Sequence, residues 1–155
     1  MKSSKVKLND LTKDNLSALR RINSVVLQTT YSDSWYKKSL EVGQLAKVAV
    51  YNEVPIGAIR CALEMEGSLP VRIYIMTLAV LAPYRSRGAG TQLLHHIIEQ
   101  AKGFFVHEIY VHVWTENLEG IEWYQKQGFT KVSLEKRYYQ KMNPPNDAWV
   151  MSMKV

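Results

Sequence analysis

The sequence lacks a second cysteine, since Cys61 is the only one among its 155 residues. A single thiol can form neither an internal disulfide bond nor a zinc or iron–sulfur site held by several thiolates. We therefore expect no metal site and a reducing compartment, cytoplasmic with or without the nucleus. The apolar runs fall short of the ~18 residues that a membrane-spanning helix needs, and the N-terminus does not resemble a secretory signal, so no membrane partner is expected.

Glycine and proline are also scarce, with 8 and 5 residues, and no linker, repeat or low-complexity segment interrupts the chain. The length is typical of one domain, so we expect a single domain over residues 1–155. The formal net charge is +6, yet the chain has no Lys/Arg-rich block. This charge favours an anionic partner of some kind, but without a basic stripe interleaved with aromatic residues we expect no direct, specific nucleic-acid binding.

Hydrophobic spacing predicts helices and strands over the whole chain. Helices are expected from a cap at Thr12 to about residue 26, with Leu16, Leu19, Ile22, Val25 and Val26 on the buried face, and over 35–42, 88–103 and 117–127. Strands are expected over 5–8, 45–51, 56–65, 72–81, 108–113, 130–138 and 149–155, with a hairpin turn at 52–55. The nearly continuous apolar run at 72–81 is typical of a central strand that is covered on both faces.

A glycine-rich segment, Arg85-Ser86-Arg87-Gly88-Ala89-Gly90, separates the most apolar predicted strand from an amphipathic helix. The free N–H groups and dipole at a helix start attract anions, and glycines let the backbone approach phosphate closely. The segment has neither the Gly-Lys-Ser/Thr of a Walker loop nor the spacing of a Rossmann fingerprint. Taken alone, it fits a phosphate site and a basic turn equally well.

The same segment resembles motif A of the GCN5-related N-acetyltransferase (GNAT) superfamily, whose loop binds the pyrophosphate of acetyl-coenzyme A. Residues 117–129, NLEGIEWYQKQGF, are similar to the superfamily's N-x-x-A-x-x-F-Y-x-x-x-G-F motif. Gly120 and Trp123 stand where that motif has Ala and Phe, and we interpret both as packing adjustments. The resemblance implies an α/β (α+β) GNAT fold, with a mostly antiparallel mixed sheet of about seven strands, splayed at strands 4 and 5, and about four flanking helices.

More narrowly, residues 40–58, 72–85, 109–113 and 137–142 together resemble the catalytic subunit of the NatE-type N-terminal acetyltransferase. The resemblance implies an enzyme that transfers acetyl from acetyl-CoA, its cosubstrate, to the α-amino group of polypeptides by direct attack in a ternary complex. The partners that it implies are polypeptide N-termini, with a NatA-type acetyltransferase complex and the ribosome as further candidates.

Three residues would carry the chemistry. The resemblance implies that Tyr74 and His112 act as general base through an ordered water and that Tyr124 protonates the coenzyme A thiolate. Taken singly, a packed core tyrosine and a hydrogen-bonded core histidine are the commoner explanations. A modest base would suffice, because deprotonating a peptide α-amine at neutral pH costs about 1 kcal/mol, against about 4.6 kcal/mol for a lysine side chain.

The resemblance also assigns binding residues. Cofactor contacts are expected from Leu78, Val80, Arg85, Ser86, Arg87, Gly88, Ala89, Gly90, Thr91, Asn117 and Tyr124. A β-bulge near 78–80 is expected to free a backbone N–H for the thioester carbonyl. Substrate contacts are expected from Leu27, Gln28, Thr29, Tyr31, Met76, Tyr138 and Tyr139.

One departure from the resembled family affects specificity. Leu27-Gln28-Thr29 replaces a Phe-Pro-Val segment that forms part of the pocket for an initiator Met. The added polar groups of Gln28 and Thr29 could each cost a buried Met side chain about 1 to 3 kcal/mol. The preference for Met-starting peptides is therefore open.

An alternative function is that of a catalytically weak or inactive CoA-binding subunit of a ribosome-associated N-terminal acetyltransferase complex. A small-amine acetyltransferase would call for an acidic channel, which the tyrosines at 138 and 139 do not suggest.

Overall fold

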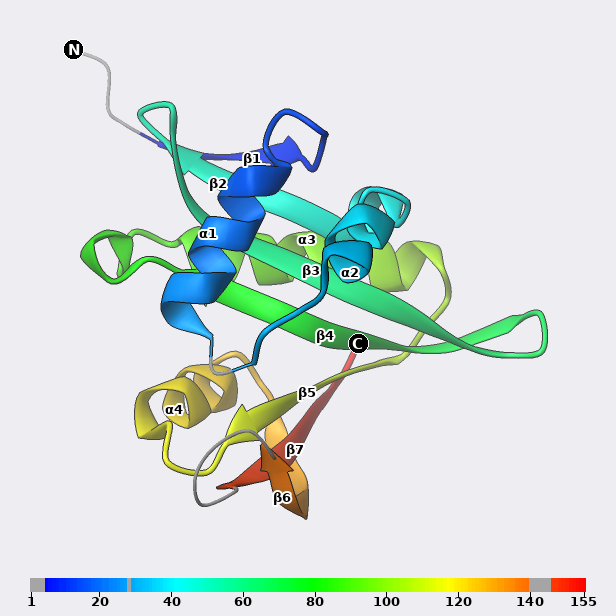
Figure 1. Cartoon of the computed structure of the whole chain (residues 1–155). Helices are drawn as coiled ribbons and strands as arrows, with labels where there is room; N and C mark the ends of the chain where they lie inside the picture. The colour runs from blue at the N-terminus through cyan, green and yellow to red at the C-terminus, as the bar shows by residue number, and fades with distance from the viewer. Residues whose placement is uncertain (1–4, 28, 140–145) are drawn as a thin grey trace. The chain divides into compact units, whose positions relative to one another are not determined.

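The computed structural model describes residues 5–27, 29–139 and 146–155. Its elements are β1 (Val6–Asp10), α1 (Leu16–Val26), α2 (Asp33–Ser39), β2 (Ala46–Tyr51), β3 (Val54–Glu66), β4 (Leu69–Val80), α3 (Ala89–Gly103), β5 (Glu108–Trp114), α4 (Leu118–Lys126), β6 (Thr130–Tyr139) and β7 (Asn146–Lys154) (Figure 1). Short 3-10 turns precede β2 (Gly43–Leu45) and follow β4 (Ala82–Tyr84).

The strands are hydrogen-bonded in the order β1-β2-β3-β4-β5-β7-β6. β4 and β5 pair in parallel, whereas β1–β2, β2–β3, β5–β7 and β6–β7 pair antiparallel. Together with the four α-helices of the described residues, this order confirms the expected mixed α/β GNAT fold. The position of β4 inside the sheet also confirms the interpretation of 72–81 as a central strand.

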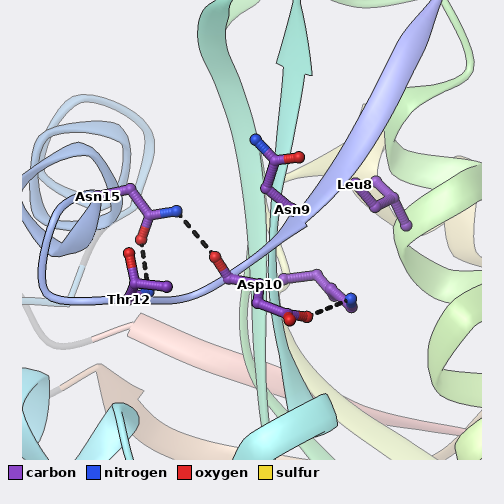
Figure 2. Close-up of a pocket in the computed structure, with 6 residues that line it drawn as sticks. Leu8, Asn9, Asp10, Thr12 and Asn15 are labelled. Carbon is purple, nitrogen blue, oxygen red and sulfur yellow. Dashed lines mark hydrogen bonds and ion pairs between the residues drawn. The ribbon is translucent and has the colours of Figure 1, made fainter.

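The start of α1 corrects the prediction that Thr12 caps it. Asn15 precedes the helix, and its side chain accepts from the Thr12 N–H at 2.8 Å and donates to the Asp10 carbonyl at 2.9 Å. Figure 2 shows this polar turn, which lines a pocket with Leu8, Asn9 and Lys47. Thr12 therefore belongs to a turn closed by Asn15, and the helix begins only at Leu16.

Two further details of the helices differ from the predictions. Val25 is 68% exposed rather than buried, because Asn23 occupies the core-facing position beside Leu19 and Ile22. The second helix begins at Asp33, two residues before the predicted start, because the Ser32 hydroxyl caps it by accepting from the Trp35 N–H at 3.2 Å.

The chain divides into two compact units. The first comprises Met1–Ala62 and Met76–Gln100. Within it, α1 and α2 lie on one face of β2 and β3, and α3 lies on the opposite face (Figure 1). Its core consists of fully buried apolar residues, among them Leu19, Ile22, Ile56, Ala58, Leu93, Leu94 and Ile97. The predicted β2–β3 hairpin is present, and its turn residues Asn52 and Glu53 have the positive φ angles of +49° and +66° that two-residue hairpin turns require.

The second unit comprises Leu63–Ile75 and Ala101–Val155. Burial alternates along β5 and along β4 from Ile73 onward, so that Ile73, Ile75, Ile109, Val111 and Val113 are buried on one face. The other face carries Tyr74, Tyr110 and His112. The parallel register of β4 and β5 covers Ile73↔Ile109 to Ile75↔Val111. The splay expected beyond that register stays a prediction, as does the single domain over 1–155.

No helix of the described residues is both long and apolar enough to cross a membrane.

Candidate active site

The two predicted base residues of the second unit are in direct contact. β4 and β5 run in parallel with Tyr74 opposite Tyr110, so His112 lies two residues further along the same face. The Tyr74 hydroxyl is 2.8 Å from His112 Nδ1, and the two rings meet edge to face. The structure thus brings this pair together without an intervening group, and the water-mediated role implied by the resemblance stays a prediction.

A β-bulge brings Tyr138 to the same pair. In a regular strand, residues 135 and 138 would point to opposite faces. Arg137 has a φ of +58°, and the β6–β7 register shifts between Glu135 and Tyr139. The Arg137 N–H donates to Asp147 Oδ1 at 2.7 Å, which holds the bulge. The prediction of a plain strand missed this bulge.

Tyr138 completes an aromatic cluster around His112. Its ring stacks on the imidazole with centroids 4.0 Å apart, and its hydroxyl lies 3.1 Å from the Tyr74 hydroxyl. Tyr139 packs edge-on against Tyr138 at 5.0 Å. Tyr138, predicted as a substrate residue, therefore lies beside Tyr74 and His112, with Tyr139 next to it.

Glu135 is a site residue that sequence reasoning missed. Its Oε2 atom lies 2.6 Å from His112 Nε2, so both imidazole nitrogens have a partner. The histidine side chain is 14% exposed and the glutamate side chain 51%. No sequence signal could have found this contact, because the bulge at Arg137 decides which β6 side chains share a face.

A second polar cluster of the same unit involves Tyr110, Glu64 and Arg72. The Tyr110 hydroxyl donates to Glu64, and Arg72 Nε donates to the same carboxylate at 2.6 Å. The Arg72 guanidinium lies 4.5 Å from the Tyr110 ring centroid. Burial raises the pKa of Tyr110, and its hydrogen bond to Glu64 raises that pKa further. Tyr110 therefore packs against Tyr74 as a protonated phenol and makes a poor base.

In the first unit, the predicted substrate residues Tyr31 and Met76 are joined. The Tyr31 hydroxyl donates to the Met76 carbonyl at 3.2 Å, and its ring stacks on Trp35 with centroids 4.1 Å apart. Leu27 and Thr29 are half-buried. Gln28 lies outside the described residues.

Arg60 is a second residue that the sequence interpretation missed. It is 7% exposed in the middle of β3. Its guanidinium donates to Ser39 Oγ at 3.0 Å and to the Cys61 carbonyl at 2.8 Å, and it contacts Met76 Sδ at 3.3 Å. Burial lowers the pKa of Arg60, which has hydroxyl, carbonyl and thioether partners rather than a carboxylate. A lone arginine inside the apolar 56–65 run was the available signal.

The motif A segment has the geometry of an anion-binding loop. Ser86 and Gly88 have positive φ angles of +66° and +83°, and α3 begins directly afterwards at Ala89. A Cβ placed on Gly88 would meet nothing within 4 Å, so the space beside it is open. Glycine is favoured at this position because of its positive φ, which residues with a side chain rarely adopt. These features fit a phosphate group approaching the first turn of α3.

The remaining motif A residues are placed as follows. Arg85 Nε donates to the Val80 carbonyl at 3.0 Å, and Arg87 donates to the Tyr51 hydroxyl at 3.1 Å. Both arginines are exposed, and Ala89 is buried, while Leu78, Val80, Gly90 and Thr91 are half-buried. Burial alternates along β4 without a break from Ile73 to Val80, so nothing in that pattern marks the expected bulge, which stays a prediction.

The second motif forms α4 and its cap. Asn117 Oδ1 accepts from the Gly120 N–H at 3.0 Å, as predicted for a capping residue. A Cβ on Gly120 would lie 2.4 Å from Asn117 Nδ2, so the missing methyl group makes room for the cap. This explains the packing adjustment at position 120. Tyr124 is buried and packs edge-on against Phe129 at 5.1 Å, and its role as an acid stays a prediction.

The described residues offer no competing chemistry. Cys61 is fully buried, and burial raises the pKa of its thiol. A buried neutral thiol is a poor nucleophile. No group of three or more His, Cys, Asp or Glu side chains in the described part of the chain could hold a metal ion. A covalent intermediate on Cys61 is therefore disfavoured.

The fold and this site define an acetyltransferase. Residues 12–129 match the acetyltransferase (GNAT) family, and the chain belongs to that family.

Within it, the chain is 40% identical over 149 residues to N-alpha-acetyltransferase 50 of Danio rerio, covering 95% of this chain and 87% of that protein. It is 39% identical over 153 residues to the probable N-acetyltransferase san of Drosophila melanogaster, covering 97% and 82%. The structure of Arabidopsis thaliana Naa50 with the bisubstrate analogue CoA-Ac-MVNAL superposes with a TM-score of 0.88 at 38% identity, covering 97% and 99%.

Proposed function

We propose that this acetyltransferase transfers acetyl from acetyl-CoA to the α-amino group of polypeptides, by direct attack in a ternary complex. Its similarity to N-alpha-acetyltransferase 50 supports this substrate class, as does the peptide analogue bound by Arabidopsis Naa50. The observation that carries the proposal is the contact between the Tyr74 hydroxyl and His112 Nδ1 at 2.8 Å, which joins a proton acceptor to a hydroxyl on one half-buried sheet face.

Different residues of the chain would serve different steps of acetyl transfer. Acetyl-CoA, when bound, supplies an acetyl group on a thioester that a neutral amine can attack. Tyr74 and His112 would take the proton that the attacking amine loses, with or without a bridging water. Arg85, Arg87 and the first turn of α3 would hold the pyrophosphate. Tyr124 would return a proton to the leaving thiolate.

The tyrosines predicted as substrate residues would bind the peptide. We propose that Tyr31, Tyr138 and Tyr139 contact the first peptide residues, because tyrosines combine an apolar ring with a hydroxyl for the peptide backbone. Leu27 would retain an apolar wall for a Met side chain, while the polar residues that follow it at 28 and 29 would weaken that wall. Peptides that begin with Met are thus the first to test. We expect the preference for Met to be weaker than in a family member that has Phe-Pro-Val at this segment.

We propose a cytoplasmic or nuclear location, with a NatA-type complex and the ribosome as partners. The positive net charge supports an anionic partner such as the ribosome.

The test is a screen for coenzyme A release from acetyl-CoA. Peptides that differ in their first two residues are compared with a lysine-bearing peptide whose N-terminus is blocked. We expect release with free N-termini and none with the blocked peptide. If the protein binds coenzyme A yet no peptide causes release, it is instead an inactive subunit.

A further inference from the structure

We propose that Glu135 is the positioning residue of His112, which fixes the nitrogen that carries the imidazole proton and so sets the direction of proton transfer. The inference rests on the proposed function for its catalytic consequence. It starts from one observation of the second unit, the distance of 2.6 Å between Glu135 Oε2 and His112 Nε2.

The carboxylate determines the order of donors and acceptors. An ionised carboxylate accepts hydrogen bonds only, so His112 must donate to Glu135 from Nε2. The neutral imidazole then presents a lone pair at Nδ1, where the Tyr74 hydroxyl donates at 2.8 Å. The Tyr74 oxygen can in turn accept from the Tyr138 hydroxyl at 3.1 Å. The four side chains form one directed chain from Tyr138 through Tyr74 and His112 to Glu135.

This order lets a proton move in one direction. When the substrate amine attacks, its nitrogen gives a proton to the Tyr74 oxygen, directly or through water, while the Tyr74 proton passes to His112 Nδ1. One N–H bond of the amine breaks and one O–H bond forms on Tyr74, whose original O–H bond is replaced by an N–H bond on His112. The resulting imidazolium lies between Tyr74 and the Glu135 carboxylate. A charge-assisted hydrogen bond stabilises that cation more than a neutral partner would.

The backbone is built to bring Glu135 and Tyr138 to one histidine. Glu135 and Tyr138 are three positions apart, which in a regular strand would put them on opposite faces. The positive φ of Arg137 and its N–H bond to Asp147 produce the bulge that reverses this parity. The ring of Tyr138 stacks on His112, so the imidazole is held on its face by Tyr138 and at its edge by Glu135. The bulge therefore serves the orientation of His112.

The test compares Glu135→Gln, which removes the charge but keeps an acceptor, with Glu135→Leu, which removes both. Glu66→Gln is the matched control, because it removes the same charge from an exposed glutamate of the same unit. Turnover and KM are measured with a saturating supply of acetyl-CoA and the best peptide of the screen. We expect kcat to fall about fivefold in Glu135→Gln and about thirtyfold or more in Glu135→Leu, with the peptide KM within about twofold of wild type. The control should keep wild-type kcat.

A second readout does not depend on turnover. In protein labelled with ¹⁵N-histidine, the His112 Nε2 proton should give a slowly exchanging downfield resonance, identified by its absence from His112→Gln. The resonance should persist in Glu66→Gln and disappear in Glu135→Leu. If Glu135→Leu does not fold, as judged by circular dichroism, the kcat of Glu135→Gln alone decides whether the Glu135 carboxylate contributes to turnover.

The failures of the two proposals are distinguishable. An active wild type whose kcat changes by less than about twofold in both Glu135 variants overturns the inference and leaves the proposed function intact. An inactive wild type overturns the proposed function, and the resonance then decides whether Glu135 orients His112. Absence of that resonance from the folded wild type contradicts the contact.

Discussion

Replacing Tyr74 by Phe removes one oxygen from the centre of the proposed proton path. That oxygen lies 2.8 Å from His112 Nδ1 and 3.1 Å from the Tyr138 hydroxyl. The ring itself packs against Tyr110 with centroids 4.7 Å apart, and this contact survives in Phe. The substitution therefore removes a hydroxyl while keeping the local packing.

The magnitude distinguishes a proton path from a packing role. A neutral hydrogen bond contributes about 1 kcal/mol, which would slow turnover by about fivefold if it only oriented His112. Loss of an atom that transfers the proton costs on the order of a hundredfold. We therefore expect kcat to fall at least about tenfold in Tyr74→Phe and in His112→Ala, with the dissociation constant of coenzyme A within about threefold.

The assay is continuous detection of the free thiol of coenzyme A with a peptide substrate, and calorimetry supplies the dissociation constant. Tyr36→Phe is the matched control, because it removes a buried hydroxyl of the first unit that lies 3.4 Å from Asn23 Nδ2. It should retain wild-type turnover. Unchanged turnover in both Tyr74→Phe and His112→Ala would remove these residues from the mechanism.

Three further predictions concern the supporting structure. Asn117→Ala removes the cap of α4 and should lower the free energy of unfolding by about 1 kcal/mol in urea titrations, and an unchanged midpoint would contradict the capping role. Hydrogen bonds from Lys47 and then Gln44 lower the pKa of Asp10. This stabilisation is present above the unfolded pKa and is lost as the pH falls through the lower folded value. Asp10→Asn should therefore reduce the melting temperature at neutral pH, with a difference that vanishes in acid. Cys61 should resist a thiol reagent in the native state and react on unfolding, and rapid native labelling would contradict its burial.

The features that could be predicted from the sequence are those set by neighbouring residues. The 3.6-residue spacing of Leu93, Leu94 and Ile97 marked α3, and the apolar run at 72–81 marked the central strand. Asn117 and Gly128 marked the two ends of α4, and Gly128 has the positive φ of +107° expected after a helix. Motif A could be located because its glycine, arginines and helix start are consecutive.

The features that could not be predicted depend on contacts between distant segments. Glu135 reaches His112 only because Arg137 adopts a positive φ, and a polar residue on a strand gives no sign of such a bulge. Arg60 stood out as a lone arginine in the apolar 56–65 run, but its partners Ser39 and Met76 come from other segments and could not be read from that run. Val25 fitted the apolar periodicity of α1, but Asn23 took the buried position.

The central claim is that this chain acetylates polypeptide α-amino groups. It is tested most directly by mass spectrometry of one peptide carrying both a free N-terminus and an internal lysine, incubated with acetyl-CoA and the purified protein. We predict a single acetyl group on the N-terminal nitrogen, lost in His112→Ala. Acetylation of the lysine alone, or of neither amine, would contradict the account.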